Sequence, residues 1–440
     1  MPVRRSKLYD AVGRSSKPRS CRVHRMANVI VPARGMRDML PKSKAKRDRV
    51  LAQIRDVYTR SGFQEIETPA VEPLSRLTSG EGGDNEKMLF QIMRRGLPAD
   101  GEVSVHDAAD LGLRYDLTVP LTRYYATNHL ELPRVFRSFQ AGPVWRAERP
   151  QKGRFRQFVQ CDIDIIGDPS ITAEVDLVVS TYGALKVLGL AQGATVLVND
   201  RRILLDMLAA GGVAEENADQ ALISLDKADK IGFDAVRSEL ITDGIAKEAS
   251  VDRLLDLVKK MGDAGSSVLD AGEVDGVSLY DVPNIINAVR EIVPGVKIIF
   301  DPTLVRGMGY YTGPIFEVKH ERVPYSIAGG GRYDRVVGKW LGKDVPACGF
   351  SIGFERIVDL VEEGVDAGTK VALLYKPGGN PVPLLELKYE LQNQGMEVSL
   401  VAPPRRPNSL FFSGLSDDGY THMLDGRREG ALPSDLKALG

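Results

Sequence analysis

The chain has 440 residues, of which 43% are hydrophobic and 27% charged, a composition typical of a globular protein with two or three domains. Its 58 Lys and Arg residues balance 59 Asp and Glu residues, so a polyanionic partner would need a locally basic face. Three distant cysteines, Cys21, Cys161 and Cys348, exclude a disulfide-rich scaffold and favour a reducing compartment. With five scattered histidines and no long apolar run, we expect a cytoplasmic protein without a zinc site or a membrane span.

The first 25 residues carry eight Arg and Lys residues and a single acid, Asp10, with almost no apolar periodicity. We predict that residues 1–25 form a disordered basic extension. One interpretation is an organelle transit peptide, which shares this Arg- and Ser-rich composition. The other is an upstream extension before a working start at Met26, and the lack of an amphipathic face favours it.

Residues 44–61 repeat apolar side chains at helical spacing and predict a helix. Residues 62–71 alternate as a strand, which Pro69 restricts to an edge or an end of a sheet. Between residues 112 and 167, three β-rich runs follow one another with short connections, and they predict antiparallel pairing. These runs are LRYDLTVP, RVFRSFQAGPVWRAE and FRQFVQCDIDIIG.

A helix-rich stretch over about residues 200–293 interrupts this pattern and indicates an inserted helical domain. Strand-like sequence returns at KIIFDPTLV, residues 297–305. After residue 368, the order strand, helix, strand predicts a small α/β module.

Residues 142–164 hold the densest concentration of charge, with five basic side chains and one acid in their first half. Two strands joined by a basic hairpin would direct guanidinium groups at one point, which suits a phosphate. The alternative is a solvated charged face. Near the end of this run, Asp162 and Asp164 share one face of the predicted strand, opposite Ile163 and Ile165.

Three later segments also have features that suit the binding of a ligand. Arg306 lies among glycines and aromatic residues, where a free surface position is not expected. Residues 329–331 are three consecutive glycines, which allow a ligand to approach the backbone closely, although their spacing matches no P-loop. Near Gly353 the pattern changes from strand to helix, which places Arg356 in the first helical turn.

These segments, in this order, closely resemble the histidyl-tRNA synthetases, a family of class II aminoacyl-tRNA synthetases. The resemblance covers about residues 30–365. It rests on an N-terminal signature, the class II motif 1, motif 2, a histidine-specific signature and motif 3, which read ARGMRDMLP, GFQEIETPAVEPL, GPVWRAERPQKGRFRQF, LVRGMGYYTG and GFSIGFER.

The resemblance implies an α+β fold in which helices flank an antiparallel class II sheet. The catalytic domain would comprise residues 26–199 and 294–366, separated by the helical insertion at 200–293. Residues 367–440 would form a small α/β domain like the family's anticodon-binding domain. Its second half departs from the family pattern, so we expect a truncated or divergent module.

The family's chemistry implies roles for the arginines. Arg146 would grip the α-phosphate of ATP and the substrate carboxylate, and Arg306 would approach that phosphate from the opposite side. Both would be catalytic. ATP would enter with Mg²⁺ on its phosphates, without a metal held by the protein. The ATP-binding residues implied are Arg146, Glu148, Arg154, Phe158 and Arg356.

The same resemblance implies a histidine pocket. The family's positions for the α-amino group of histidine correspond to Asp116, Thr118 and Gln160. The positions that bracket the imidazole correspond to Asp164 and Tyr311. Arg306 and Tyr310 complete the implied set. Without the resemblance, Thr118 and Tyr310 could be plain strand residues, and Asp164 could lie on a solvated sheet face. Gly309 replaces an acidic residue of many relatives, which removes one carboxylate that could position Arg306.

The implied partners are ATP, L-histidine, tRNA(His) and a second copy of the chain, since motif 1 builds a homodimer in this class. The implied function is activation of histidine and its transfer to tRNA. Two alternatives differ in kind. One is the non-catalytic, histidine-binding regulatory subunit of ATP phosphoribosyltransferase, which commonly lacks the arginines retained here. The other is a synthetase paralogue that activates histidine for another acceptor.

Overall fold

The computed structural model describes residues 30–78, 88–97, 104, 108–149, 154–263, 269–306, 310–362, 369–378 and 380–439. The basic extension predicted at residues 1–25 and the substitution at Gly309 lie outside these ranges. Within them, no helix has the length and apolar character needed to cross a membrane.

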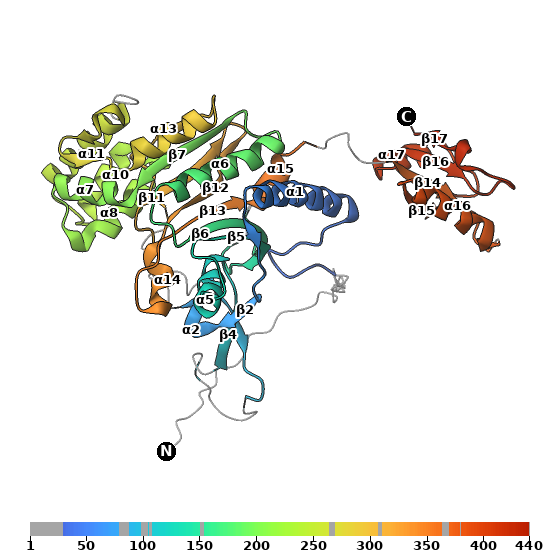
Figure 1. The fold of residues 1–440 in the computed structure, drawn as a ribbon, viewed down its shortest axis with the longest axis horizontal. Helices are drawn as coiled ribbons and strands as arrows, with labels where there is room; N and C mark the ends of the chain where they lie inside the picture. The colour runs from blue at the N-terminus through green and yellow to red at the C-terminus, as the bar shows by residue number, and fades with distance from the viewer. Residues whose placement is uncertain are drawn as a thin grey trace, which may run out of the picture.

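An eight-stranded sheet forms the centre of the fold (Figure 1). Its strands pair antiparallel except at the two outer pairs, where β1 runs parallel to β5 and β10 runs parallel to β7. This sheet with its flanking helices confirms the predicted α+β class. The strands, in spatial order, are β1 (Gln64–Glu65), β5 (Phe136–Trp145), β6 (Gln157–Ile166), β13 (Ala347–Gly353), β12 (Val323–Arg332), β11 (Pro314–His320), β7 (Ala194–Asp200) and β10 (Ile298–Phe300).

One face of the sheet is apolar and packs against helices. The predicted helix at 44–61 is α1 (Pro41–Arg60), which buries Val50, Ile54 and Tyr58. These residues share one core with Ile163 and Ile165 of β6. The apolar side chains of β6 are buried on this face of the sheet. The alternate side chains of the strand therefore point to the opposite face, which can hold polar groups. The helices that contribute to this core include α6 (Thr172–Val187), α13 (Val282–Ile292) and α15 (Phe354–Leu360).

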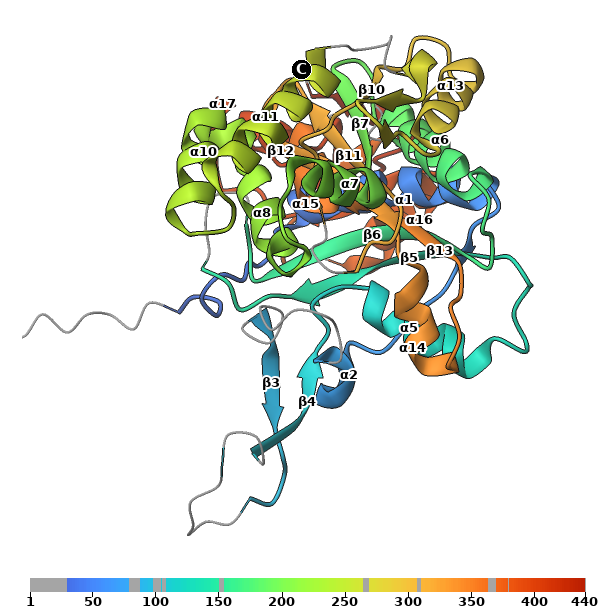
Figure 2. The same ribbon diagram turned by 90° about the vertical axis from the view of Figure 1, so that its left-hand side faces the viewer.

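The predicted strand at residues 62–71 is shorter than expected. Only Gln64–Glu65 pair as β1, at an edge of the sheet as Pro69 indicates, and the chain pairs again as β2 (Val71–Pro73) in a separate sheet. That three-stranded sheet has the order β2-β4-β3 and projects below the main sheet in Figure 2. Its other members are β4 (Ala109–Leu113) and β3 (Phe90–Met93), next to the short helix α2 (Leu74–Leu77).

The prediction of a strand over LRYDLTVP was wrong beyond Leu113. The strand ends at Leu113, and helix α5 (Thr118–Asn128) begins four residues after Arg114. The side chain of Asp116 accepts a hydrogen bond of 3.1 Å from the N–H of Val119, which satisfies a free donor of the first turn. Leu121 and Tyr125 then become buried on one side of the helix. Capping and burial together outweigh the strand preference of the preceding residues.

The stretch predicted as a helical insertion contains helices whose buried apolar side chains belong to the same core as those of the main sheet. Leu204, Leu222, Leu254 and Val258 are among these buried residues. The elements of this stretch are α7 (Arg201–Gly211), the 3-10 turn η1 (Glu215–Asn217), α8 (Ala218–Leu225), α9 (Ala228–Ile231), α10 (Phe233–Thr242), α11 (Glu248–Asp263) and the hairpin strands β8 (Glu273–Val274) and β9 (Val277–Ser278). Helix α14 (Asp334–Leu341) lies elsewhere, beside α5 (Figure 2).

The C-terminal residues form a four-stranded sheet with the order β15-β14-β16-β17. The predicted strand, helix and strand are β14 (Lys370–Leu374), α16 (Pro381–Asn393) and β15 (Glu397–Val401). The chain then adds a further helix, whose first turn is capped by the side chain of Asn408. The remaining elements are α17 (Ser409–Asp417), β16 (His422–Asp425), the 3-10 turn η2 (Pro433–Asp435) and β17 (Lys437–Ala438).

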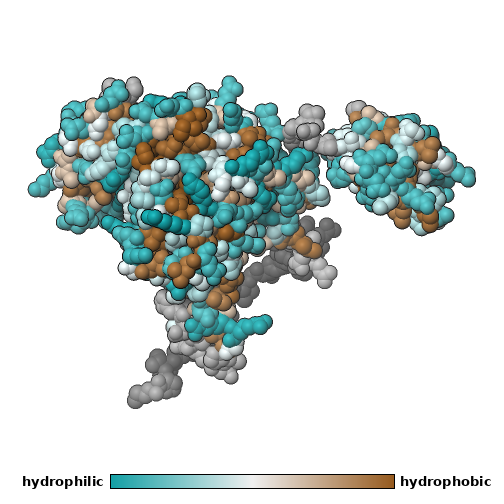
Figure 3. Space-filling model, in the orientation of Figure 1, coloured by the Kyte–Doolittle hydropathy of each residue, from teal (hydrophilic) through white to brown (hydrophobic). Residues whose placement is uncertain are grey.

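The surface seen in Figure 3 is mostly polar, with separate apolar patches over the main body. Two exposed apolar residues, Ile292 and Ile299, lie at the β10 edge of the sheet, with exposed fractions of 56% and 40%. Isolated apolar residues of this kind are ordinary on globular proteins.

Candidate active site

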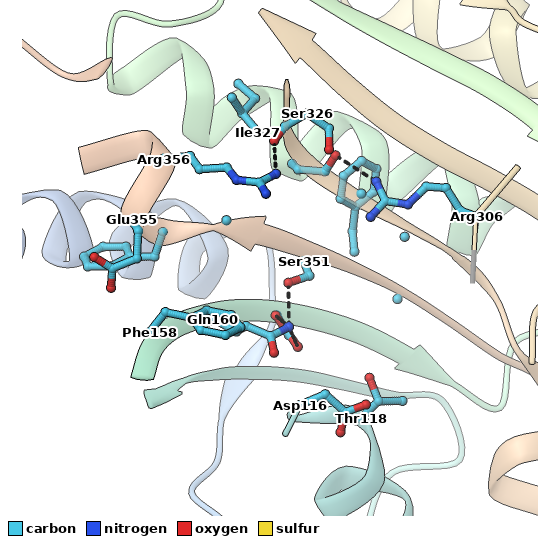
Figure 4. A pocket seen from close by; sticks show the side chains of 18 of the residues that line it. Asp116, Thr118, Phe158, Gln160, Arg306, Ser326, Ile327, Ser351, Glu355 and Arg356 are labelled. Carbon is cyan, nitrogen blue, oxygen red and sulfur yellow. Dashed lines mark hydrogen bonds between the residues drawn. The ribbon is translucent and has the colours of Figure 1, made fainter. Parts of the chain in front are cut away.

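A cavity of about 320 Å³ opens on the polar face of the sheet, a size that suits a small molecule. Arg306 and Arg356 lie on one side of it, and Asp116 and Thr118 on the other (Figure 4). All twelve site residues predicted from the sequence line this cavity: Asp116, Thr118, Arg146, Glu148, Arg154, Phe158, Gln160, Asp164, Arg306, Tyr310, Tyr311 and Arg356. The structure therefore brings together segments as far apart as α5 and α15.

Strand β6 supplies two of the carboxylates that line the cavity. Its alternation is as predicted, because Ile163 and Ile165 are fully buried in the core while Asp162 and Asp164 line the cavity. A solvated face was the wrong alternative, since these two aspartates are only 5% and 4% exposed. Carboxylates are removed from water to this extent only where they have partners or a ligand to bind.

Asp164 has one partner from outside its own strand. The hydroxyl of Tyr333, which follows β12, donates a hydrogen bond of 2.6 Å to its Oδ1. Burial raises the pKa of Asp164 to about 7, although the Tyr333 hydrogen bond opposes this shift. Gly349 lies directly opposite on β13, where a Cβ atom would stand 2.0 Å from Oδ1. Sequence reasoning missed Tyr333, which directly follows GGGR in the glycine-rich segment.

Two further carboxylates extend this acidic region. Asp162 accepts a hydrogen bond of 3.3 Å from the side-chain amide of Gln160, which also donates to the hydroxyl of Ser351. Burial and the neighbouring Asp164 raise the pKa of Asp162 well above its usual value. Burial also raises the pKa of Asp116, against the opposing effect of its backbone hydrogen bonds and of Arg146. The region is therefore suited to a cationic or hydrogen-donating group.

The neutral polar residues Thr118, Tyr310 and Tyr311 differ in their surroundings. Thr118 is the first residue of α5, so the alternative of a plain strand residue was wrong. Tyr310 and Tyr311 lie between the 304–306 segment and β11, with ring centroids 4.3 Å apart. Tyr311 packs against the main core while also lining the cavity, and burial raises its pKa well above the usual value. Both hydroxyls therefore remain protonated donors.

Arg146 is held at the end of β5 by the backbone. Its Nε donates a hydrogen bond of 3.0 Å to the carbonyl of Tyr115, and its guanidinium carbon lies 5.1 Å from the ring centroid of Phe158. These contacts fix the side chain next to Asp116, and its Nη groups have no other hydrogen bond among the described residues, so they can bind a ligand.

Arg306 is positioned by a carboxylate that sequence reasoning missed. Its Nη1 donates a hydrogen bond of 2.9 Å to Glu317 of β11. Glu317 follows Arg306 by eleven residues and lies between the buried residues Phe316 and Val318, so alternation alone places it on the polar face. A Cβ atom on Gly329 would stand 1.7 Å from Nη1 of Arg306. The three glycines were expected to let a ligand approach the backbone. At Gly329, the group that approaches the backbone is the guanidinium of Arg306.

Arg356 confirms the predicted change from strand to helix, since β13 ends at Gly353 and α15 begins at Phe354. It donates a hydrogen bond of 2.5 Å to the carbonyl of Ser326. Burial, with the nearby charges of Arg154 and Arg306, lowers its pKa. Guanidinium groups that repel one another around one cavity are stabilised when an anion binds between them.

The arrangement separates two kinds of chemistry. Arg306 and Arg356 on one side can bind phosphate oxygens, and Arg146 reaches the cavity beside Asp116. The buried carboxylates of β6 and the half-buried Asp116 can accept hydrogen bonds from an amine or an imidazole. Among the residues that the structure describes, no group of three or more His, Cys, Asp and Glu side chains could hold a metal ion. A divalent cation that arrives with a nucleotide is part of that substrate.

Comparison with known proteins identifies the family of this chain. The histidyl-tRNA synthetase family profile matches residues 35–357. A histidine–tRNA ligase of Leifsonia xyli is 47% identical over 392 residues, 85% of this chain and 90% of that protein. One of Porphyromonas gingivalis is 34% identical, over 92% and 94% of the two chains. The chain therefore belongs to the histidyl-tRNA synthetase family, whose members are aminoacyl-tRNA ligases.

Solved structures show the same fold. A histidyl-tRNA synthetase from Nostoc superposes with a TM-score of 0.71 at 25% identity, covering 92% of each chain. A Bacillus halodurans protein described as an ATP phosphoribosyltransferase regulatory subunit/histidyl-tRNA synthetase has a TM-score of 0.69 at 22% identity, over 87% of this chain and 95% of that one. At that identity the second likeness concerns the fold alone.

The pKa of Asp164 predicts a pH-dependent stability. The unfolded carboxyl loses its proton near pH 4, whereas the folded one retains it until about pH 7, so wild-type stability falls as the pH rises through this window. The Asp164→Asn variant has no carboxyl at this position, so it does not lose stability in this way as the pH rises. Its melting temperature relative to the wild type should therefore increase between pH 5 and pH 8. The exposed Asp243→Asn is the control, and an Asp164→Asn difference that is constant with pH would contradict the assignment.

Proposed function

We propose that this protein activates L-histidine with ATP, forming histidyl-adenylate and pyrophosphate, and then transfers histidine to the 3′ end of tRNA(His). The observation that carries the proposal is that arginines and the buried carboxylates of β6 line one cavity. Family membership supports it, because the related enzymes are named histidine–tRNA ligases.

The first step needs positioning and charge neutralisation without a protein nucleophile. An oxygen of the histidine carboxylate attacks the α-phosphorus of ATP. The new C–O–P linkage forms as the bond from this phosphorus to the oxygen bridging to the β-phosphorus breaks, and pyrophosphate leaves with that electron pair. Arg146 and Arg306 line the same cavity and carry the charge needed to stabilise the phosphorus oxygens.

The remaining ATP contacts are assigned by the family resemblance and supported by position. Arg356 binds the γ-phosphate, and Glu148 and Phe158 lie on the adenine side together with Arg154. Glu148 accepts a hydrogen bond of 3.2 Å from Nη1 of Arg154, so the two residues restrain each other on the hairpin. Mg²⁺ enters with the β- and γ-phosphates of the nucleotide.

The histidine contacts occupy the acidic side. Asp116, Thr118 and Gln160 receive the α-amino group, while Asp164 and Tyr311 hydrogen-bond the two imidazole nitrogens beside Tyr310. A carboxylate next to one ring nitrogen selects the imidazole tautomer. Competing amino acids would leave these buried polar groups unpaired, which is a strong basis for rejection.

Aminoacyl transfer also requires contacts with the tRNA. We assign the C-terminal α/β module, residues 367–440, to anticodon binding and the helical insertion, residues 200–293, to a separate domain of the enzyme. Because the net charge is −1, binding depends on local basic faces and should weaken with salt.

The proposed function is tested by ATP–pyrophosphate exchange followed by charging of tRNA(His). We expect exchange that depends on histidine, and then transfer of the amino acid. Absence of exchange with retained histidine binding would favour the regulatory-subunit alternative. Exchange without charging would favour a paralogue that serves another acceptor.

Replacing Arg306 tests the catalytic assignment. Arg306→Ala should reduce the exchange rate by about a hundredfold or more, because the guanidinium acts on charge that develops in the transition state. Histidine affinity, measured by calorimetry, should change little. Arg237→Ala is the matched control, since its ion pairs with Glu248 and Asp252 lie on the surface of the helical stretch. Weakened histidine binding with unaltered turnover would contradict the role.

We also propose a cytoplasmic homodimer that pairs through the motif 1 region. Support comes from β1, which lies at an edge of the main sheet. The N–H of Ile66 bonds to Phe139 of β5, so the N–H of the preceding Glu65 points away from the sheet. Such an unpaired edge is a site for a second copy.

Sedimentation should give about twice the chain mass of 48.1 kDa, as expected for a two-fold assembly. Glu65→Pro removes the outward N–H without removing a bond to β5, so it should increase the monomer fraction. Glu65→Ala retains the N–H and should remain dimeric. A wild-type monomer at micromolar concentration would refute the assembly.

A further inference from the structure

The segment before α1 crosses the nucleotide side of the cavity, and the function proposed above gives it no role. Residues 33–36 form a turn closed by a 2.9 Å hydrogen bond from the N–H of Met36 to the carbonyl of Ala33. Gly35 has a φ of 82°, a conformation that favours glycine. The turn directs the carbonyl of Gly35 to the N–H of Arg156, at 2.8 Å.

Arg37, two residues later, joins two walls of the cavity. Its guanidinium carbon lies 3.3 Å from the ring centroid of Phe155, which belongs to the basic hairpin. Its Nη2 donates a hydrogen bond of 2.5 Å to Glu355 in the first turn of α15. Phe155 and Glu355 line the cavity, whereas Arg37 does not. Arg37 therefore reaches the cavity through these two residues.

Glu355 has other partners that keep it in place. Arg47 of α1 donates hydrogen bonds of 2.6 Å and 2.8 Å to its two carboxylate oxygens, and the N–H of Val159 donates one of 3.2 Å. Although burial opposes ionisation, the hydrogen bond from Arg47 is the leading influence that holds the pKa of Glu355 below its usual value. Loss of Arg37 would thus leave the buried carboxylate paired and would mainly release the hairpin.

The attachments of the hairpin at this point lie outside the main ladder. Residues 154–156 precede β6 and lie outside its ladder with β5, which begins at Gln157. Within the described residues, their backbone hydrogen bonds include the one that the N–H of Arg156 donates to the carbonyl of Gly35 and one from the N–H of Arg146 to the carbonyl of Arg156, at 2.8 Å. The same hairpin carries Glu148, Arg154 and Phe158. Its position relative to α15 sets the distance between these groups and Arg356.

We propose that Arg37 is a positioning residue for the nucleotide half of the site. By stacking on Phe155 and pairing with Glu355, it holds the hairpin and α15 at the separation that ATP requires. The inference rests on the proposed ATP-dependent function. It assigns no contact with the reacting atoms, so it predicts an effect on ATP binding and none on histidine binding.

Calorimetric titrations of Mg-ATP and of histidine, performed separately, test this role. Arg37→Ala should weaken ATP binding about tenfold, as expected for loss of a partly buried stacked ion pair, and leave histidine affinity unchanged. Arg37→Lys retains the charge but loses the planar stack, so it should fall between wild type and Arg37→Ala. Phe155→Leu should resemble Arg37→Lys, and the effects of Arg37→Ala and Phe155→Leu should not add in the double variant.

Arg60→Ala is the matched control, because Arg60 pairs only with Asp56 at the exposed end of α1 in the part of the chain described. Equal weakening of ATP and histidine binding, an unchanged ATP affinity in Arg37→Ala, or additive effects with Phe155→Leu would overturn the proposal. Exchange activity of the wild type is measured in parallel. Its absence would refute the proposed function, while the ATP titrations would still decide the role of Arg37.

Discussion

Two-sided burial of β6 is the constraint on which the cavity depends. Ile163 and Ile165 are fully buried against the helices on one face, which fixes the register of the strand relative to the core. The same register forces Asp162 and Asp164 onto the opposite face. A shift of one residue would bury the carboxylates among apolar side chains and expose the isoleucines, at a cost far beyond any gain elsewhere. Packing of the apolar core therefore orients the chemistry of the site.

The arginines are arranged before any ligand binds. Mutual repulsion opposes this arrangement, and each guanidinium is held by a separate acceptor: a carbonyl of Tyr115 for Arg146, Glu317 for Arg306 and a carbonyl of Ser326 for Arg356. Because these acceptors use only part of the donor capacity, the remaining N–H groups can meet phosphate oxygens without rearrangement. Charges fixed in advance stabilise a transition state more effectively than charges that must first be ordered.

Much of the fold could be predicted because its signals are local. The helical spacing before residue 61, the alternation of β6 and the change from strand to helix near Gly353 each depend on neighbours in sequence. The prediction failed after Leu113, where strand-like residues are followed by a capping interaction from Asp116 to Val119. The twelve site residues were named by family resemblance, and alternation alone independently placed Asp162 and Asp164 on one face.

Sequence by itself determined the faces of the strands, the helix after β13 and the residue types that chemistry of this kind requires. Only the tertiary structure decided which residues form hydrogen bonds with these side chains. Asp164 pairs with Tyr333, Arg306 with Glu317, and Arg37 with Glu355. Periodicity defines the side of an element on which a residue lies, because backbone geometry repeats locally. It carries no information on which distant side chain packs opposite, since Arg37 and Glu355 are 318 positions apart and meet only when the whole sheet has formed.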